Sequence, residues 1–239
     1  MDTISFVNKK VMELWHKWEN ELKRIENDLK VPLIYPSMAQ EVLLFVGSNP
    51  SFVASAYRSV LRDGNYNTTP EDFLSWRNHG KYALEMYQHV ERKVRKSYYR
   101  FFKVLDEISK EVGLEYEHID LFFYRKTGQK ELKKVVYDDK GKLNEFGCEQ
   151  LKLSGKLIET VMPKVIVVAN AFASHLFKEK YGLKWDNEHG YYIWRPQSGE
   201  RNVPVFLGSM LSGQRALDIY SRERLIWHIK KAIKETTNE

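Results

Sequence analysis

Two short apolar runs constrain the fold of this chain more than any other feature. Residues 42–46 read VLLFV and residues 164–170 read KVIVVAN, and a segment with helical spacing follows each of them. An unbroken run of aliphatic and β-branched residues of this length is typical of a strand that is buried on both faces of a parallel sheet. We therefore expect an α/β protein in which helices cover a central sheet.

The rest of the chain fits the same architecture. Apolar residues recur at spacings of three and four in the longer segments that we predict to be helices, which are 3–29, 71–112, 147–161 and 221–234, with Gly80 as a candidate break within 71–112. Further strands are predicted at 117–125, 190–196 and 202–208. Together these predict a three-layer α/β/α fold with a central, mainly parallel sheet of about four strands. Because no repeat or linker divides the chain, we expect one domain over 1–239, with an N-terminal helix in 1–30 and an insertion at 126–147.

The composition limits the compartment and the kinds of site. The single cysteine, Cys148, excludes a disulfide framework and a cysteine-based zinc cluster. No apolar run reaches the roughly 20 residues that span a bilayer, and the opening MDTISFVNKK lacks the apolar region of a secretory signal. We therefore expect a cytoplasmic protein without a metal or other cofactor. Its net charge of +6 permits nucleic-acid binding.

Three loops that follow predicted strands carry the candidate chemistry. They are Gly47-Ser48-Asn49-Pro50-Ser51, the stretch from Asp120 to Arg125, and the stretch from Gly208 to Arg215. Because ligands bind at the carboxyl ends of parallel strands, we expect these loops to converge on one cleft. In the first loop, Asn49 supplies an amide that can hold a water or a carbonyl. The alternative for this loop is a Gly-Asn-Pro turn with no chemistry.

These motifs resemble those of a known family. VLLFVGSNPS is similar to the first motif of the uracil-DNA glycosylase superfamily in its Gly-x-Asn-Pro form. EHIDLFFYR resembles the segment in which an Asn reads the uracil edge and an Arg follows five residues later, a spacing that Asp120 and Arg125 reproduce. MPKVIVVANAFA resembles a third stretch of the family, with Asn170 where Gly is usual, and Leu211, Ser212 and Arg215 match its Leu-Ser-x-x-Arg.

The resemblance implies a uracil-DNA glycosylase-like fold and a role in base excision repair. DNA would be the partner, and the reaction would be hydrolysis of the N-glycosidic bond of a flipped, damaged or deaminated base. Asn49 would position the attacking water, Asp120 would read the base, and Leu211 would fill the gap in the base stack. The other residues that the resemblance places at the substrate are Gly47, Ser48, Pro50, Ser51, Phe52, Arg125, Ser209, Ser212 and Arg215.

Two departures from the family pattern keep other functions open. Leu207 stands where the family has a catalytic His, and Asp120 replaces an Asn. An ionised Asp only accepts hydrogen bonds, so reading uracil would need a protonated Asp120 or a different base. The alternatives are a catalytically inactive nucleic-acid or nucleotide-binding protein on the same fold and an unrelated α/β enzyme of nucleotide metabolism. The four-cysteine iron–sulfur site of some branches is excluded by the single cysteine.

Overall fold

The computed structural model describes residues 2–197, 199, 201–213 and 216–237. The chain forms two compact units, and each unit is built from several stretches of sequence. The first, which we call the helical unit, holds Met1–Ser37, Asn49–Tyr99 and Asp120–Leu157. The second, which we call the sheet unit, holds Met38–Ser48, Arg100–Ile119 and Ile158–Glu239. The single domain over 1–239 that we expect from the sequence stays a prediction, because compact units and domains need not coincide.

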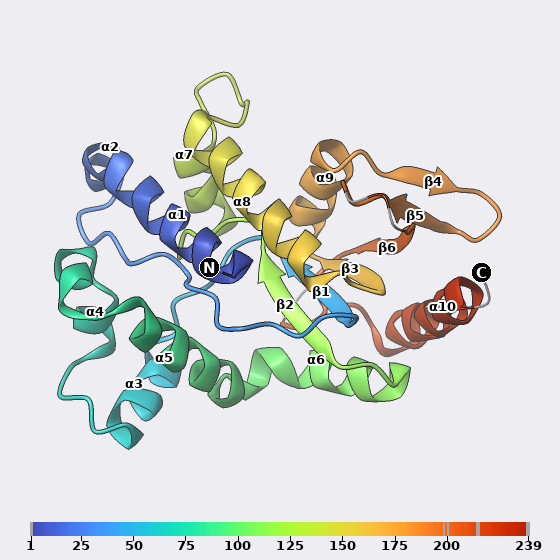
Figure 1. The fold of residues 1–239 in the computed structure, drawn as a ribbon, viewed down its shortest axis with the longest axis horizontal. Coiled ribbons are helices and arrows are strands. Elements are labelled where there is room, and N and C mark those ends of the chain that lie inside the picture. Colours follow the sequence, from blue (N-terminus) through green and yellow to red (C-terminus); the bar gives the residue numbers. More distant parts are fainter. Residues whose placement is uncertain (1, 198, 200, 214–215, 238–239) are drawn as a thin grey trace. The chain divides into compact units, whose positions relative to one another are not determined.

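A six-stranded sheet in the order β2-β1-β3-β6-β5-β4 forms the framework of the sheet unit (Figure 1). The strands are β1 (Leu43–Gly47), β2 (Tyr116–Asp120), β3 (Val165–Ala169), β4 (Lys184–Asp186), β5 (Tyr191–Trp194) and β6 (Val203–Gly208). The central pairs β1–β3 and β3–β6 are parallel, whereas β5 pairs antiparallel with both β6 and β4. The expected α/β class is confirmed, and the sheet has six strands rather than four. The strand β4 has only three residues, too few to leave a periodic signal in the sequence.

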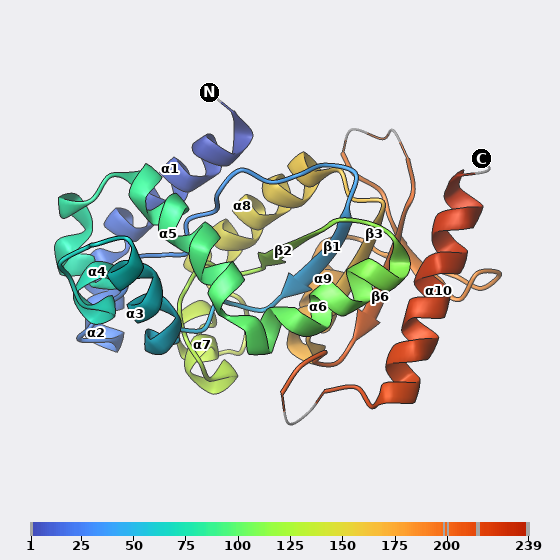
Figure 2. The same ribbon diagram turned by 90° about the horizontal axis from the view of Figure 1, so that it is seen from below.

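Helices cover both faces of this sheet. Leu43, Phe45, Val165 and Val167 lie in one core cluster with residues of α6 (Tyr99–Val112) and α10 (Ile219–Thr237). On the other side, α9 (Ala171–Lys180) packs against β3 and β6 (Figures 1 and 2). Alternate residues of a strand point to opposite faces, so a strand covered on both sides must be apolar throughout. This explains why the runs at β1 and β3 are unbroken, and it confirms that both are buried strands.

Most of the helices belong to the helical unit. They are α1 (Thr3–Lys17), α2 (Glu19–Ile25), α3 (Ala54–Asp63), α4 (Pro70–Leu74), the 3₁₀ helix η1 (Trp76–Lys81), α5 (Leu84–Ser97), α7 (Gln129–Val136) and the larger part of α8 (Glu145–Val161). The helix expected over 3–29 is divided at Trp18, whose backbone leaves the helical region. The helix expected over 71–112 is likewise divided into α4, η1, α5 and α6, and the insertion at 126–147 contains α7.

Aromatic side chains fill the centre of the helical unit. The ring of Trp15 lies 5.1 Å from that of Phe146 and 6.0 Å from that of Tyr124, measured between centroids. Residues 121–125, which we predicted as part of a strand, are buried but continue beyond the end of β2 without strand pairing.

In the part of the chain that the structure describes, no helix is both long and apolar enough to cross a membrane.

Candidate functional site

The parallel strands β1, β3 and β6 of the sheet unit end together. Val46 pairs with Val168, and Ala169 pairs with Gly208, so the chain leaves β1, β3 and β6 at the same edge of the sheet. The residues that follow these strands are Ser48, Asn170 and Ser209. The side chain of Ser48 is buried, and Ser209 is half-buried.

Side chains at this edge fasten α9 to the sheet. The Oδ1 atom of Asn170 accepts hydrogen bonds from the backbone N–H groups of Phe172 (2.9 Å) and Ala173 (3.1 Å). The hydroxyl of Ser174 donates to the carbonyl oxygens of Gly208 (2.9 Å) and Val168 (3.3 Å). Asn170, which stands where the family pattern has Gly, therefore acts as the N-cap of α9.

The loop after β6 turns its leucine inward. Leu211 is 6% exposed and belongs to the core cluster that α6 and α10 form on the sheet. A role as a wedge in the base stack would require Leu211 to leave this core. Ser212 is half-buried, and the predicted Arg215 lies outside the described residues.

The amide of Asn49 is held by the segment that follows β2. Its Nδ2 atom donates to the carbonyl oxygens of Lys126 (2.5 Å), Tyr124 (3.3 Å) and Pro50 (3.4 Å). The backbone N–H of Lys126 donates in turn to the carbonyl of Pro50 at 3.0 Å. The loop after β1 and the segment after β2 are thus joined within the helical unit by side-chain and backbone hydrogen bonds.

Two further predicted residues follow Asn49 in the same loop. Ser51 is exposed, whereas Phe52 is half-buried. The ammonium of Lys30 lies 4.8 Å from the centre of the Phe52 ring, a cation–π distance, and the ring of Tyr57 lies 6.0 Å away. Phe73, by contrast, is fully buried and packs against Tyr82 and Tyr87.

Asp120 is a buried carboxyl at the end of β2. Its residue is 5% exposed, and its backbone N–H donates to the hydroxyl of Tyr35 at 2.7 Å. Burial raises the pKa of Asp120 to about 7, because removal from water penalises the carboxylate. The positive charges of Arg95 and Arg125 act in the opposite direction and limit this rise. Near neutral pH the group is therefore divided between its neutral and ionised forms.

Arg125 lies in a buried polar network. Its guanidinium donates to the carboxylate of Glu91 (2.5 Å), the hydroxyl of Tyr57 (2.7 Å) and the carbonyls of Val31 (2.9 Å) and Pro32 (3.3 Å). The Tyr57 hydroxyl donates to the same carboxylate. The side chains of Arg125 and Glu91 are 1% and 6% exposed. The pKa of Tyr57 is raised well above its usual value, first by burial, and the hydroxyl is neutral.

The two units divide the residues predicted from the sequence. Asn49, Pro50, Ser51, Phe52, Asp120 and Arg125 belong to the helical unit. Gly47, Ser48, Ser209, Leu211 and Ser212 belong to the sheet unit. Within the helical unit, hydrogen bonds join the Asn49 loop to Tyr124 and Lys126, which flank Arg125.

Sequence reasoning missed the residues that support this cluster, namely Tyr35, Tyr57 and Glu91. One signal was available for Glu91. It occupies the buried face of α5 with Tyr87, Val90 and Val94. An acid inside an apolar helical stripe indicates a buried charge that needs a partner. The two tyrosines left no comparable signal, because an aromatic residue in an amphipathic segment is first of all a core residue.

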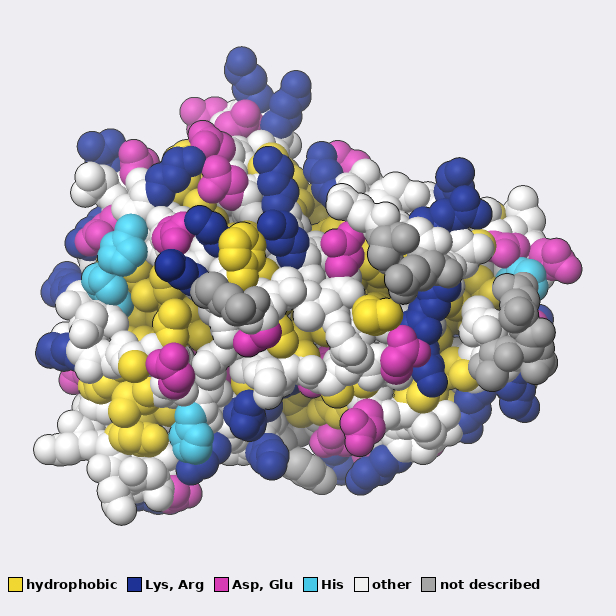
Figure 3. All heavy atoms as spheres, in the orientation of Figure 1, with side chains coloured by type: hydrophobic (Ala, Val, Ile, Leu, Met, Phe, Trp, Pro, Cys, Tyr) yellow, Lys and Arg dark blue, Asp and Glu magenta, His cyan; other side chains and the backbone are white. Residues whose placement is uncertain are grey.

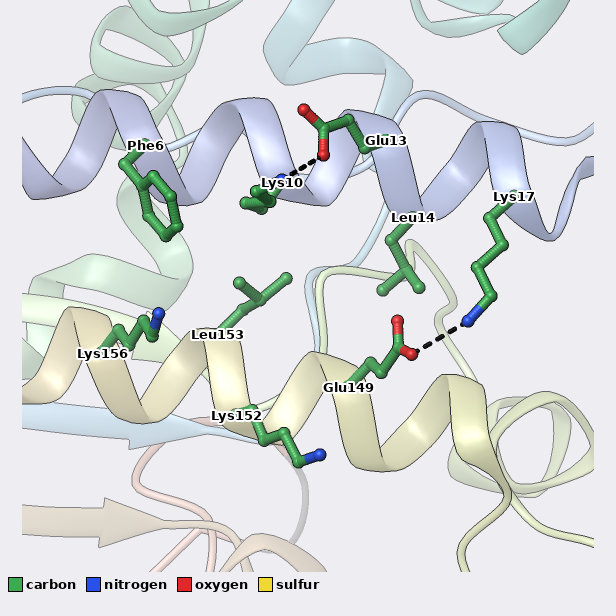
Figure 4. A pocket seen from close by; sticks show the side chains of 9 residues that line it. All are labelled: Phe6, Lys10, Glu13, Leu14, Lys17, Glu149, Lys152, Leu153 and Lys156. Carbon is green, nitrogen blue, oxygen red and sulfur yellow. Dashed lines mark hydrogen bonds and ion pairs between the residues drawn. The ribbon is translucent and has the colours of Figure 1, made fainter. Parts of the chain in front are cut away.

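The helical unit also has a groove between α1 and α8 (Figure 4). Apolar side chains form its floor, namely Phe6, Leu14 and Leu153, and four lysines lie around them: Lys10, Lys17, Lys152 and Lys156. Figure 3 shows basic side chains scattered among acidic ones on this face. Lys10 pairs with Glu13, and Lys17 pairs with Glu145 and Glu149. These pairs neutralise much of the charge of the groove.

Comparison with known proteins adds no relative. No protein-family model matches the chain, and no curated protein matches it. Among the described residues, no group of three or more His, Cys, Asp or Glu side chains is placed to hold a metal ion. The function must therefore be argued from the residues themselves.

Proposed function

We propose that this protein binds DNA and hydrolyses the N-glycosidic bond of a flipped, damaged or deaminated base. The observation that carries the proposal is the attachment of the Asn49 amide to the segment that begins at Asp120. One continuous segment, residues 120–126, thus contains the carboxyl that would read the base and also holds the amide that would position the water. Pre-positioned polar groups of this kind lower the barrier to hydrolysis because they need no reorganisation during the reaction.

The state of Asp120 supports the reading of a base. A neutral carboxyl has one O–H donor and one carbonyl acceptor, which matches the donor and acceptor of an Asn amide. With its pKa raised to about 7 by burial, Asp120 carries this proton in about half of the molecules at neutral pH. A protonated Asp120 would donate a hydrogen bond to a carbonyl of the base and accept one from an N–H of the base, as the Asn of the resembling family does.

The water would be held by the other end of the Asn49 amide. Because Nδ2 donates to backbone carbonyls, the carbonyl oxygen Oδ1 is the atom that would accept a hydrogen bond from the water. The water oxygen would form a bond to the sugar C1′ as the bond from C1′ to the base nitrogen breaks. The base would leave with that electron pair as an anion, and the proton that the water loses would pass through solvent to the released base.

Incubation with synthetic oligonucleotides tests this proposal. The substrates contain uracil, hypoxanthine, xanthine or a mismatch, and base release is detected as an alkali-labile site. We expect release of at least one base, its loss in Asn49→Ala, and a rate that falls above about pH 7 as Asp120 ionises. Base release that is equally fast in Asn49→Ala would contradict the proposed role of Asn49.

A catalytically inactive nucleic-acid or nucleotide-binding protein is the second candidate. Two observations favour it: Leu207 stands where the family has its catalytic His, and Leu211 is buried in the core cluster. Loss of one oxyanion-type hydrogen-bond donor raises the activation barrier by about 2.7–4 kcal/mol in a well-studied enzyme, and the Leu207 side chain has no such donor. Binding of the same oligonucleotides without any base release would select this second function.

A further inference from the structure

An open polar hollow in the helical unit is separate from the cluster around Asn49, Asp120 and Arg125. It lies where α3, the loop 66–69, α4 and the end of η1 meet. Its lining consists of Arg58, Arg62, Tyr66, Asn67, Thr68, Thr69, Asp72, Asn78, Lys81 and Tyr82. All of these side chains are polar or aromatic, so the hollow suits a charged ligand with flat rings better than an apolar one.

The charges in this hollow are mostly positive. Arg58 and Arg62 are four residues apart on α3 and therefore lie on one face of the helix, and Lys81 adds a third cation. The only acid in the lining is Asp72, whose carboxylate accepts a hydrogen bond from the Thr69 hydroxyl at 2.9 Å. Three cations against one acid leave a net charge of +2.

Two of these cations have no competing partner. Within the ranges that the structure describes, neither the guanidinium of Arg58 nor the ammonium of Lys81 makes a hydrogen bond or an ion pair. Arg62 pairs with Asp63, but both side chains are largely exposed, so solvent weakens this pair. An anionic ligand would therefore replace few contacts within the protein.

Each of the two aromatic rings that line the hollow packs against another part of the helical unit. A Cβ atom added to Gly64 would lie 2.5 Å from the ring of Tyr66, so only glycine lets this ring lie against the backbone. The ring of Tyr82 packs against Phe73 at 4.9 Å. Both tyrosines are half-buried. A fixed ring with one accessible side can stack on a nucleobase, and stacking is tolerant of base identity.

The helix that carries the arginines is itself fixed. Tyr57, the residue before Arg58, is bonded to Arg125 and Glu91 in the buried network. Ala56, Tyr57, Val60 and Leu61 are buried, whereas Arg58 and Arg62 are exposed. The network thus holds α3 with its basic face directed outward, which reduces the entropy lost when the arginines bind a ligand.

We propose that this hollow binds a single-stranded segment of nucleic acid. Arg58, Arg62 and Lys81 would contact successive phosphates, and Tyr66 would stack on a base. Guanidinium groups suit this role because their planar donors bind phosphate oxygens in pairs. The inference rests on the proposed function for the nature of the partner, and it adds a place where the strand is held without reading its sequence.

Fluorescence anisotropy with a dye-labelled, single-stranded 12-mer tests the site. We expect the double variant R58A/R62A to bind about tenfold more weakly at moderate salt, with a plot of log affinity against log salt that is shallower by about 1.4, because two phosphate contacts are lost. The matched control is K230A/K234A, which removes two exposed lysines at the same spacing on α10. Equal affinities of these two variants would overturn the proposal.

The aromatic contribution has its own pair of variants. Tyr66→Ala should weaken binding by about fivefold or more, whereas Tyr66→Phe, which keeps the ring, should bind as the unmodified protein does. Displacement of the 12-mer by polyglutamate as efficiently as by unlabelled DNA would also overturn the proposal, in favour of a general polyanion surface. Circular dichroism and melting temperatures confirm that each variant is folded.

The outcomes separate this inference from the proposed enzyme activity. If R58A/R62A loses affinity while no base is released from any substrate, the hollow binds nucleic acid and the glycosylase proposal fails. If bases are released and R58A/R62A binds and reacts as the control does, the glycosylase proposal stands and the hollow is not a strand site.

Discussion

The Nη2 atom of Arg125 lies 2.5 Å from the Oε1 atom of Glu91, and both side chains are buried. The hydroxyl of Tyr57 bonds to both of them. This relationship joins α3, α5 and the segment after β2, which are far apart in the sequence. The guanidinium of Arg125 holds these three segments together.

Removal of one partner of this buried pair should destabilise the protein strongly. Glu91→Ala leaves the Arg125 guanidinium buried without its carboxylate, and such a change costs about 3–5 kcal/mol of the free energy of unfolding. Urea denaturation measures this loss. The matched control is Glu13→Ala, which removes an exposed pair with Lys10 and should leave the unfolding midpoint nearly unchanged. A similar, small effect of both substitutions would show that the buried pair contributes little.

Asp120→Asn should stabilise the protein more at high pH than at low pH. The pKa of Asp120 is raised from 3.8 to about 7 in the folded state, so folding favours its protonated form. The group is neutral in both states well below pH 3.8, its unfavourable contribution grows as pH rises from there to about 7, and it is constant well above pH 7. An uncharged Asn removes this penalty of about 4 kcal/mol.

Melting temperatures at pH 4 and pH 8 check this prediction. The difference between Asp120→Asn and the unmodified protein should be several degrees more favourable to the variant at pH 8. Asp139→Asn, at an exposed turn, serves as the control and should show no such dependence. If the difference does not change with pH, Asp120 is not a buried carboxyl of raised pKa.

Substitutions of Asn49 test whether its amide holds the loop after β1 against the segment after β2. Asn49→Ala removes the donor to Lys126, Tyr124 and Pro50 and should cost about 1–3 kcal/mol. Asn49→Asp should cost more, because its carboxylate would face three carbonyl oxygens without a donor. Hydrogen exchange at the backbone N–H of Lys126 should accelerate in both variants, since that group bonds to Pro50. Unchanged exchange there would show that the loops are joined by the backbone alone.

The sequence reveals the sheet more readily than the candidate site. The strands β1 and β3 could be predicted because a strand covered on both faces has to be apolar at every position. The ends of the helices at Trp18 and Tyr98 could not, because the apolar stripe continues across both breaks and only tertiary packing decides where the backbone leaves the helix.

Candidate residues could be placed at strand ends, but their contacts could not be predicted. Asp120 is the last residue of β2, and Asn49 lies two residues after the end of β1, so both stand near strand ends as their motifs predict. The partners of Arg125 come from segments 68 and 34 residues away, on α3 and α5. Local spacing carries no information about such pairs, since they depend on how distant segments pack.

Substitution of Leu211 tests whether this side chain is a core residue or a wedge that enters the base stack. It is 6% exposed in the cluster formed by β1, β3, α6 and α10. Leu211→Ala should therefore cost about 2–5 kcal/mol of the free energy of unfolding, because it leaves a cavity in a packed core. The neighbouring Ser212→Ala should change stability little. If Leu211→Ala instead leaves stability unchanged and weakens binding to mismatched duplex DNA, the leucine would act as the wedge, since a wedge contributes only when it lies between bases.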